Sequence, residues 1–462
     1  MTDQSNAGDR HPSRKGRAVW GILRRFLRWW IILPLLLLAI YFVALNRTEK
    51  QLAAELAKVE ASGGALRLAD LAPRVPPGEA NAAEVYLRAF DLLTVDSEAL
   101  ERMGEDADLA RHVFATQEPA LRLLEQASQI RACAFPVDWD AGPAIAYPHL
   151  GPMREGGKLL GARAEAQAAD GQMDAALSSC AAIFRMAEHA QRDPILIGAF
   201  VGFALNGIGV TALEESLSQG DPSPAACRAL FEQLGTADPH AALERAFQGQ
   251  RAIHAELSER IHAGEIRDLF AAFSGEPVRW VQPLLVDLYR TVGRPLLNLD
   301  EVSSLRAMQQ NIAALDLPPV EGQQQMADVV AEMNQLPVYR SVLTRMIMPV
   351  FTRATLTRDR AAAEIGAAQI ALALTAYRAE HRRYPDTLAD LAAAGWDIPD
   401  DPFTGQPYIY RLEGEGFIVY SVGPDMADDG GLLPLWKEAA ELTQVEEERR
   451  RDRYDLIFRR PR

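Results

Sequence analysis

A long uncharged segment near the N-terminus constrains the fold of this chain more than any other part of its sequence. Residues 29–45 read WWIILPLLLLAIYFVAL, seventeen residues without a charged side chain. At about 1.5 Å per residue, a helix of this length just crosses a hydrocarbon core of roughly 30 Å. We therefore predict a membrane-spanning helix that is retained as a signal anchor. A cleaved signal peptide is the alternative, but the apolar run is longer than usual and no small-x-small cleavage site precedes Asn46.

Charge is distributed unevenly on the two sides of this segment. The chain carries 48 Lys and Arg against 63 Asp and Glu, a formal charge of −15. Residues 1–46 hold seven basic and two acidic side chains, so the rest of the chain carries a net −20. The positive-inside rule predicts a basic cytoplasmic tail, 1–28, and a body outside the inner membrane, in the periplasm or the extracytoplasmic space. Such an acidic body argues against nucleic acid as a partner.

A second uncharged stretch, 195–213, reads ILIGAFVGFALNGIGVTAL. Its four glycines and Asn206 dilute its hydrophobicity, and a second crossing would place Glu214 and Glu215 on the cytoplasmic side. We predict a buried helix with neighbours on every side. A second membrane span remains the open alternative.

Apolar residues recur at helical spacing from 46 to 350, and short Pro, Gly and Asp breaks separate the runs. We expect helices over 47–61, from Asn81 to 92, in pairs around Pro119 (109–130) and Gly171 (158–189), and over 223–235, 240–262, 278–292, 300–315 and 323–350. Residues 131–157 contain too many breakers for a regular element. The region 46–350 is thus predicted to be an α-helical domain. Its three cysteines, an odd number, exclude a disulfide framework.

The pattern changes after Arg353. A long amphipathic helix is expected over 361–382, followed by a short one over 387–393 and a charged one over 436–451. Residues 407–412 and 417–421 predict a β-hairpin, and 454–458 a third strand. The fold class is therefore mainly α, with a small α+β module over 354–462 that contains a three-stranded antiparallel sheet.

An ordered series of motifs in this module resembles the globular part of major pseudopilins of type II secretion systems. The motifs are AYR at 376–378, YPDTL at 384–388, DPFTGQPY at 401–408 and YSVGPD at 420–425. The likeness covers about 85 of the 462 residues. In pseudopilins the membrane segment is the first half of the long helix, whereas here it lies more than 300 residues earlier. The whole chain looks more like a group of uncharacterised bacterial proteins with a single membrane anchor.

The clearest candidate ligand set is a glycine-flanked loop that carries Asp425, Asp428 and Asp429. Calcium binds to such hard oxygen ligands, and the resemblance to pseudopilins implies a calcium site in this loop. Solvated turn residues are the alternative, because Asp and Gly favour turns. We expect Asp400 and Asp401 to form a turn, and His254 and His262 to be surface residues of an amphipathic helix.

The sequence contains no nucleophile elbow, phosphate-binding loop or zinc-protease motif. We therefore expect a membrane-anchored envelope protein, not an enzyme, that acts in protein interaction or assembly with envelope partners, related to secretion or pili. The alternative is an envelope hydrolase whose site is assembled from scattered residues, for example around Trp139, His149 and Arg154.

Overall fold

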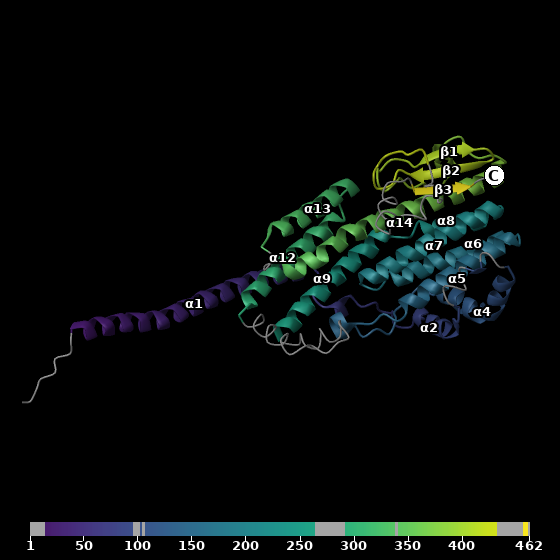
Figure 1. Cartoon of the computed structure of the whole chain (residues 1–462). Coiled ribbons are helices and arrows are strands. Elements are labelled where there is room, and N and C mark those ends of the chain that lie inside the picture. Colours follow the sequence, from purple (N-terminus) through teal and green to yellow (C-terminus); the bar gives the residue numbers. More distant parts are fainter. Residues whose placement is uncertain are drawn as a thin grey trace, which may run out of the picture.

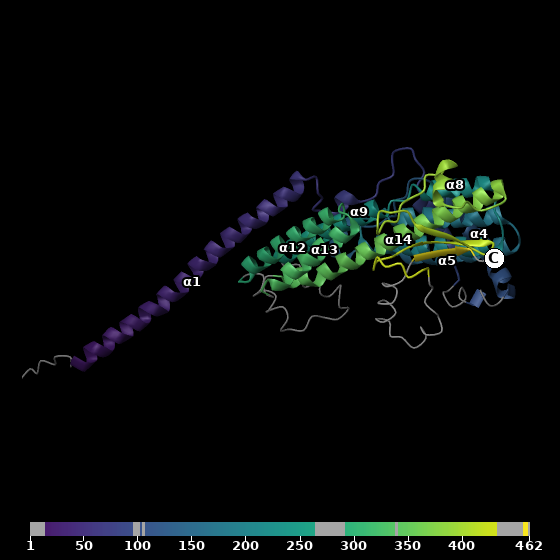
Figure 2. The same ribbon diagram turned by 90° about the horizontal axis from the view of Figure 1, so that it is seen from above.

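The computed structural model describes residues 14–95, 102–103, 107–263, 292–337, 341–431 and 456–460. A single helix, α1 (Arg14–Ala61), projects from a helical body, as Figures 1 and 2 show. Its 48 residues correspond to a length of about 70 Å. The predicted membrane helix and the charged helix after it are therefore one element. The helix ends at the predicted break, where Gly63 has a φ of 74°.

The body consists of antiparallel and crossing helices. Their bounds are α2 (Ala82–Leu92), α4 (Ala107–Ser128), α5 (Leu150–Ala169), α6 (Met173–Ala190), α7 (Leu196–Gln219), α8 (Pro224–Leu234), α9 (Pro239–Ala263), α12 (Arg294–Ala314), α13 (Pro319–Gln335) and α14 (Val342–His381). Two 3-10 helices, η1 (Leu68–Leu71) and η2 (Trp139–Ala144), lie in the connections. The predicted cap of α2 is confirmed, since the Asn81 side chain accepts a hydrogen bond from the Ala83 N–H. All three cysteines are buried and free.

Four predicted helix boundaries are wrong. The helix expected over 361–382 begins at Val342, because it is continuous with the helix before it. Helix α4 continues through Pro119, because buried residues on both sides of the proline, such as Val113 and Leu121, pack into one core. Helix α5 begins at Leu150, not at 158, because Gly156 and Gly157 serve close packing against other helices and do not break the helix. The expected helix 323–350 is divided into α13 and α14. The expected helix 278–292 lies almost entirely outside the described residues.

Helix α7, which contains nearly all of the second uncharged stretch, packs against α5, α6, α9 and α14. Among the described helices, α1 and α7 are the two that are long and apolar enough to cross a membrane. The glycines of α7 face neighbouring helices: a side chain at Gly202 would overlap Gln191, and one at Gly209 would meet the Phe184 ring. These contacts favour the predicted buried helix over a second span.

The C-terminal part follows the predicted order. After α14 comes α15 (Leu388–Ala393), where Thr387 and Asp390 form a capping box. Strands β1 (Ile409–Glu413), β2 (Gly416–Ser421) and β3 (Leu456–Arg460) form an antiparallel sheet in the order β1-β2-β3. The expected charged helix 436–451 lies outside the described residues. A mainly helical fold with a small three-stranded sheet is confirmed.

Helix α14 connects the helical region to the sheet. The boundary expected at 350–354 falls inside this helix, and one hydrophobic cluster extends from Leu68 to Phe458. A second cluster lies between α9, α12, α13 and the first half of α14, where the Phe247 and Phe351 rings meet at 4.4 Å. The sheet lies at the end of the body opposite to the free end of α1 (Figures 1 and 2).

Candidate functional site

The turn between α6 and α7, residues 191–194, brings three separate parts of the chain together. Gln191 is the C-cap of α6, and the Asp193 side chain is hydrogen-bonded to His149, at the start of α5. The Pro194 carbonyl lies against Gly249 of α9. Only glycine fits at position 249, since a Cβ there would overlap the Pro194 oxygen. One helical turn before this contact, Arg245 Nη1 donates to the Gln191 carbonyl oxygen at 2.9 Å.

A pocket of about 390 Å³ opens beside this turn. Its walls come from the end of α6, the segment after η1, the first turns of α9 and Cys133. Five charged side chains line it: Arg74, Glu188, Arg192, Asp238 and Arg245. Burial, and secondarily the charge of Arg192, lowers the pKa of the Arg245 guanidinium. The pocket is therefore a polar, net positive site on an acidic body.

The turn that lines the pocket also carries Asp193, one member of a buried His–Asp pair. His149 Nε2 and Asp193 Oδ2 are 2.7 Å apart, and both side chains are at most 3% exposed. The His149 ring stacks on Phe135 with a centroid distance of 4.0 Å. Trp139 is buried near Tyr147, whereas Arg154 is exposed. His149 thus has a carboxylate partner that the spacing of residues in the sequence did not reveal. Both side chains are buried, however, and not open to solvent.

Two further groups beside this pair are held neutral. Tyr86 Oη and His189 Nδ1 form a hydrogen bond of 2.9 Å, and burial lowers the pKa of His189 to about 3. Burial also raises the pKa of Cys133 to about 12, so its thiol stays protonated at neutral pH. Neither group carries the charge that a nucleophile or an acid catalyst would use.

The predicted calcium residues lie together on an exposed loop after β2, but two of them form turns. Asp425 Oδ1 accepts from the Ala427 N–H at 3.1 Å, and Asp428 Oδ1 accepts from the Gly430 N–H at 2.8 Å. Asp429 is exposed. Within the described part of the chain, no three His, Cys, Asp or Glu side chains gather as a metal-binding group. Calcium binding by this loop stays a prediction.

Addition of calcium to the full-length protein in detergent should raise its melting temperature and saturate, with magnesium less effective because it prefers a rigid octahedral site. Replacement of Asp425, Asp428 and Asp429 together by asparagine should remove the shift. Asp170→Asn, at an exposed position in a helix end, is the control. A shift that survives the triple variant, or no shift in the parent, would remove the calcium site.

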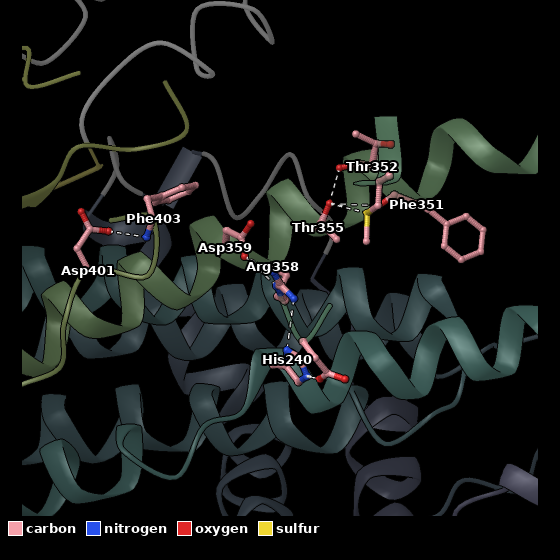
Figure 3. Close-up of polar contacts among 10 residues, drawn as sticks. His240, Phe351, Thr352, Thr355, Arg358, Asp359, Asp401 and Phe403 are labelled. Atoms are coloured by element: carbon pink, nitrogen blue, oxygen red, sulfur yellow. Dashed lines mark hydrogen bonds and ion pairs between the residues drawn. The ribbon is translucent and has the colours of Figure 1, made fainter. Parts of the chain in front are cut away.

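Asp401 forms a turn, as predicted, and is also a buried anchor. Its carboxylate accepts from the Phe403 N–H and from the Ser421 hydroxyl, each at 2.9 Å, and Figure 3 shows the first contact. The same view shows Arg358 between Asp359 and His240, with an Arg358 Nε–Asp359 Oδ1 distance of 2.8 Å. Among these contacts, the one between Arg358 Nη1 and His240 Nδ1, at 3.4 Å, joins α14 to α9.

The expectation for His254 is wrong. This histidine is 1% exposed, and neither ring nitrogen has a hydrogen-bond partner within the described structure, because α9 turns this face toward α12. Burial lowers the pKa of His254 to about 4. His262, eight residues later, is half-buried.

Acidification should therefore weaken the protein through His254. Below pH 6.5 the unfolded chain binds a proton at this residue and the folded protein does not, so the free energy of unfolding falls until about pH 4. Glu301 acts oppositely, because burial raises its pKa to about 7 and the folded protein gains a proton over the same range. The two effects oppose each other in the parent protein. The effect of each residue is therefore seen in the difference between the free energies of unfolding of its variant and of the parent at each pH.

His254→Leu should gain stability relative to the parent by about 2 kcal/mol between pH 6.5 and 5, at about 1.4 kcal/mol per proton and pH unit. Glu301→Gln should show the opposite trend. The measurement is chemical unfolding at each pH, with His112→Leu as the control at an exposed histidine. Parallel pH curves for His254→Leu and the parent would contradict the expectation.

Comparisons of the chain with protein-family models, with curated proteins and with solved structures gave no match. The resemblance to pseudopilins therefore remains a prediction.

Proposed function

We propose that the protein is anchored in the inner membrane of a bacterial envelope by α1, with residues 1–28 in the cytoplasm and the body outside. The observation that carries this proposal is the exposure of the apolar segment of α1: Trp29 is 67% exposed and Leu37 is 58% exposed. Exposed apolar surface of this extent needs a cover. A lipid bilayer covers it on all sides of the helix.

Contacts at the other end of α1 support the same proposal. The Asn298 amide donates to the Thr48 hydroxyl at 3.1 Å, and Arg306 donates to the nearly buried Glu55 carboxylate from Nε at 2.9 Å. Both partners belong to α12. The body is therefore attached directly after the apolar segment, as a membrane-proximal domain would be.

We infer further that the protein acts by binding other envelope proteins in an assembly related to secretion or pili, and not by catalysis. The order of long helix, short helix and antiparallel sheet supports this inference, because the resemblance to pseudopilins implies that order. β1 forms an edge of the sheet, and Leu412 on it is 50% exposed. Exposed edges offer pairing groups to a partner strand.

Alkaline carbonate extraction tests the anchor. The parent should remain with the membrane fraction, and replacement of Leu36 and Leu37 by lysine should release it, since each central charge costs about 2.5–3.5 kcal/mol. Glu79→Cys, at an exposed loop position, should react with a membrane-impermeant maleimide in osmotically opened envelopes. Labelling of Glu79→Cys only after lysis of the inner membrane would reverse the proposed orientation.

A photoreactive amino acid at Leu412 tests the interaction. The same group at Val320, equally exposed but on α13, is the matched control. We expect a discrete cross-linked protein from Leu412 and none from Val320. Equal patterns at both positions would count against a binding role of the sheet edge.

A second candidate function, an envelope hydrolase, has one observation in its favour, the His149–Asp193 pair. An Asp that orients a His is the usual general-base arrangement. Asp193→Asn would then abolish hydrolysis of ester or peptide substrates and change its pH profile. A purified parent that hydrolyses none of these substrates removes this candidate.

A further inference from the structure

The pocket beside the α6–α7 turn carries more basic than acidic side chains in its wall. Arg192 from the turn, Arg245 from α9 and Arg74 from the segment after η1 all line it. Within the described residues, none of the three guanidinium groups forms an ion pair. The chain as a whole is acidic, whereas three of the five charged side chains that line this pocket are basic.

Arg192 and Arg245 are held near each other by the fold. The Gly249–Pro194 contact fixes α9 against the turn, and the bond from Arg245 Nη1 to the Gln191 carbonyl sets the direction of that side chain. The pKa of Arg245 is lowered by burial and, to a smaller extent, by the positive charge of Arg192. Keeping like charges together in a partly buried site costs free energy that a bound anion would recover.

The other parts of the wall contribute charges of both signs. The first turns of α9 line it, and a helix N-terminus presents partial positive charge. Of the two acidic wall residues, Asp238 already accepts a hydrogen bond from the Ala241 N–H at 2.8 Å. Burial raises the pKa of the other, Glu188, and the charges of Arg192 and Arg185 oppose this shift, so Glu188 would compete with a bound anion for Arg192.

We propose that this pocket binds a small ligand through a carboxylate or phosphate group, held between the guanidinium groups of Arg192 and Arg245. Guanidinium forks match the oxygens of both groups in geometry and charge. A volume of about 390 Å³ accommodates a compact ligand and not a folded partner. This inference is independent of the membrane anchor and of the sheet edge.

Inorganic phosphate and succinate are the probes, titrated into the full-length protein in detergent at constant ionic strength. Calorimetric titration and the melting temperature should both show saturable binding of at least one anion. Saturation with phosphate alone identifies a phosphate-bearing ligand, and saturation with succinate alone a carboxylate-bearing one. Because phosphate also stabilises proteins by exclusion from their surface, a linear and non-saturating rise does not count as binding.

Variants connect the binding to the pocket. Arg192→Gln should weaken it about tenfold or more, because a charge-assisted hydrogen bond is lost. The Arg192 side chain donates no hydrogen bond to another described residue, and its backbone N–H, which donates to the His189 carbonyl, is kept in the variant. Arg192→Gln should therefore fold even where Arg245→Gln, which loses its bond to Gln191, does not. Glu188→Gln should strengthen binding. Arg122→Gln, on the surface of α4, is the control and should leave it unchanged.

The proposal fails if neither anion binds saturably to the parent, or if Arg192→Gln binds as tightly as the parent. It fails equally if Arg122→Gln weakens binding as much as Arg192→Gln does, because the effect would then follow overall charge and not the pocket.

Discussion

Gly249→Ala should destabilise the protein by about 3 kcal/mol or more, among the larger effects of single substitutions. The added methyl group would overlap the carbonyl oxygen of Pro194, which belongs to the backbone and cannot rotate away. Either α9 or the α6–α7 turn would have to move. Since Arg245 lies one helical turn earlier, the same movement should loosen its bond to the Gln191 carbonyl.

The matched control is Gly207→Ala in the middle of α7. There the new methyl group would meet only a Glu364 carboxylate oxygen at 3.8 Å, an ordinary contact. Alanine should therefore stabilise the helix by about 0.5–1 kcal/mol, because glycine loses more backbone entropy on folding. Chemical unfolding of both variants in detergent gives the comparison. Equal changes in the free energy of unfolding for the two variants would show that the close contact between α9 and Pro194 does not contribute to stability.

Arg460→Met should also destabilise the protein strongly, by about 3 kcal/mol. The Arg460 side chain is 1% exposed, although it belongs to the last strand, and it donates to three acceptors. These are the Thr375 hydroxyl at 3.1 Å, the Gly220 carbonyl at 2.8 Å and the Asp221 carboxylate at 2.6 Å. Methionine fills a similar volume but leaves these groups without their donor.

Arg459→Met provides the control for Arg460→Met. The Arg459 side chain is about 30% exposed and contacts Glu413 at 3.2 Å, so its loss should cost no more than about 1 kcal/mol. Hydrogen exchange adds a local readout, because the amides of β3 should exchange faster in Arg460→Met than in Arg459→Met. Equal stability of the two variants would contradict the conclusion that the hydrogen bonds of Arg460 hold β3 against the helices.

Local signals in the sequence predicted the elements whose ends depend on neighbouring residues. Asn81 caps α2, Thr387 begins α15, and the glycines around 414–416 connect β1 and β2. Each of these depends on hydrogen bonds or backbone angles within a few residues. Apolar periodicity likewise predicted most helices and the small sheet.

Features that depend on distant contacts could not be predicted in this way. A pair of glycines such as Gly156 and Gly157 is typical of a loop. Both nevertheless lie inside a helix, because the side chains of Leu124 and Leu205 pack closely against them. His254 lies on a helix with charged neighbours, and only the position of α12 makes it buried. His149 and Asp193 are 44 residues apart, and the three pocket arginines come from segments even more widely separated.

If the proposed membrane anchor is correct, the continuity of α1 fixes the height of the body above the membrane. With residues 29–45 in a bilayer, the hydrogen bond from Asn298 of α12 to Thr48 would lie about one helical turn above the hydrocarbon core. No flexible linker separates the apolar segment of α1 from the body. The orientation of the body relative to the membrane is therefore more restricted than that of a domain on a disordered linker. Helix α14, 40 residues or about 60 Å long, starts near the α12 end and carries the sheet at its far end. The edge of β1 would therefore lie several tens of ångströms from the lipid. Membrane-bound partners could reach it only if they extend that far from the membrane surface.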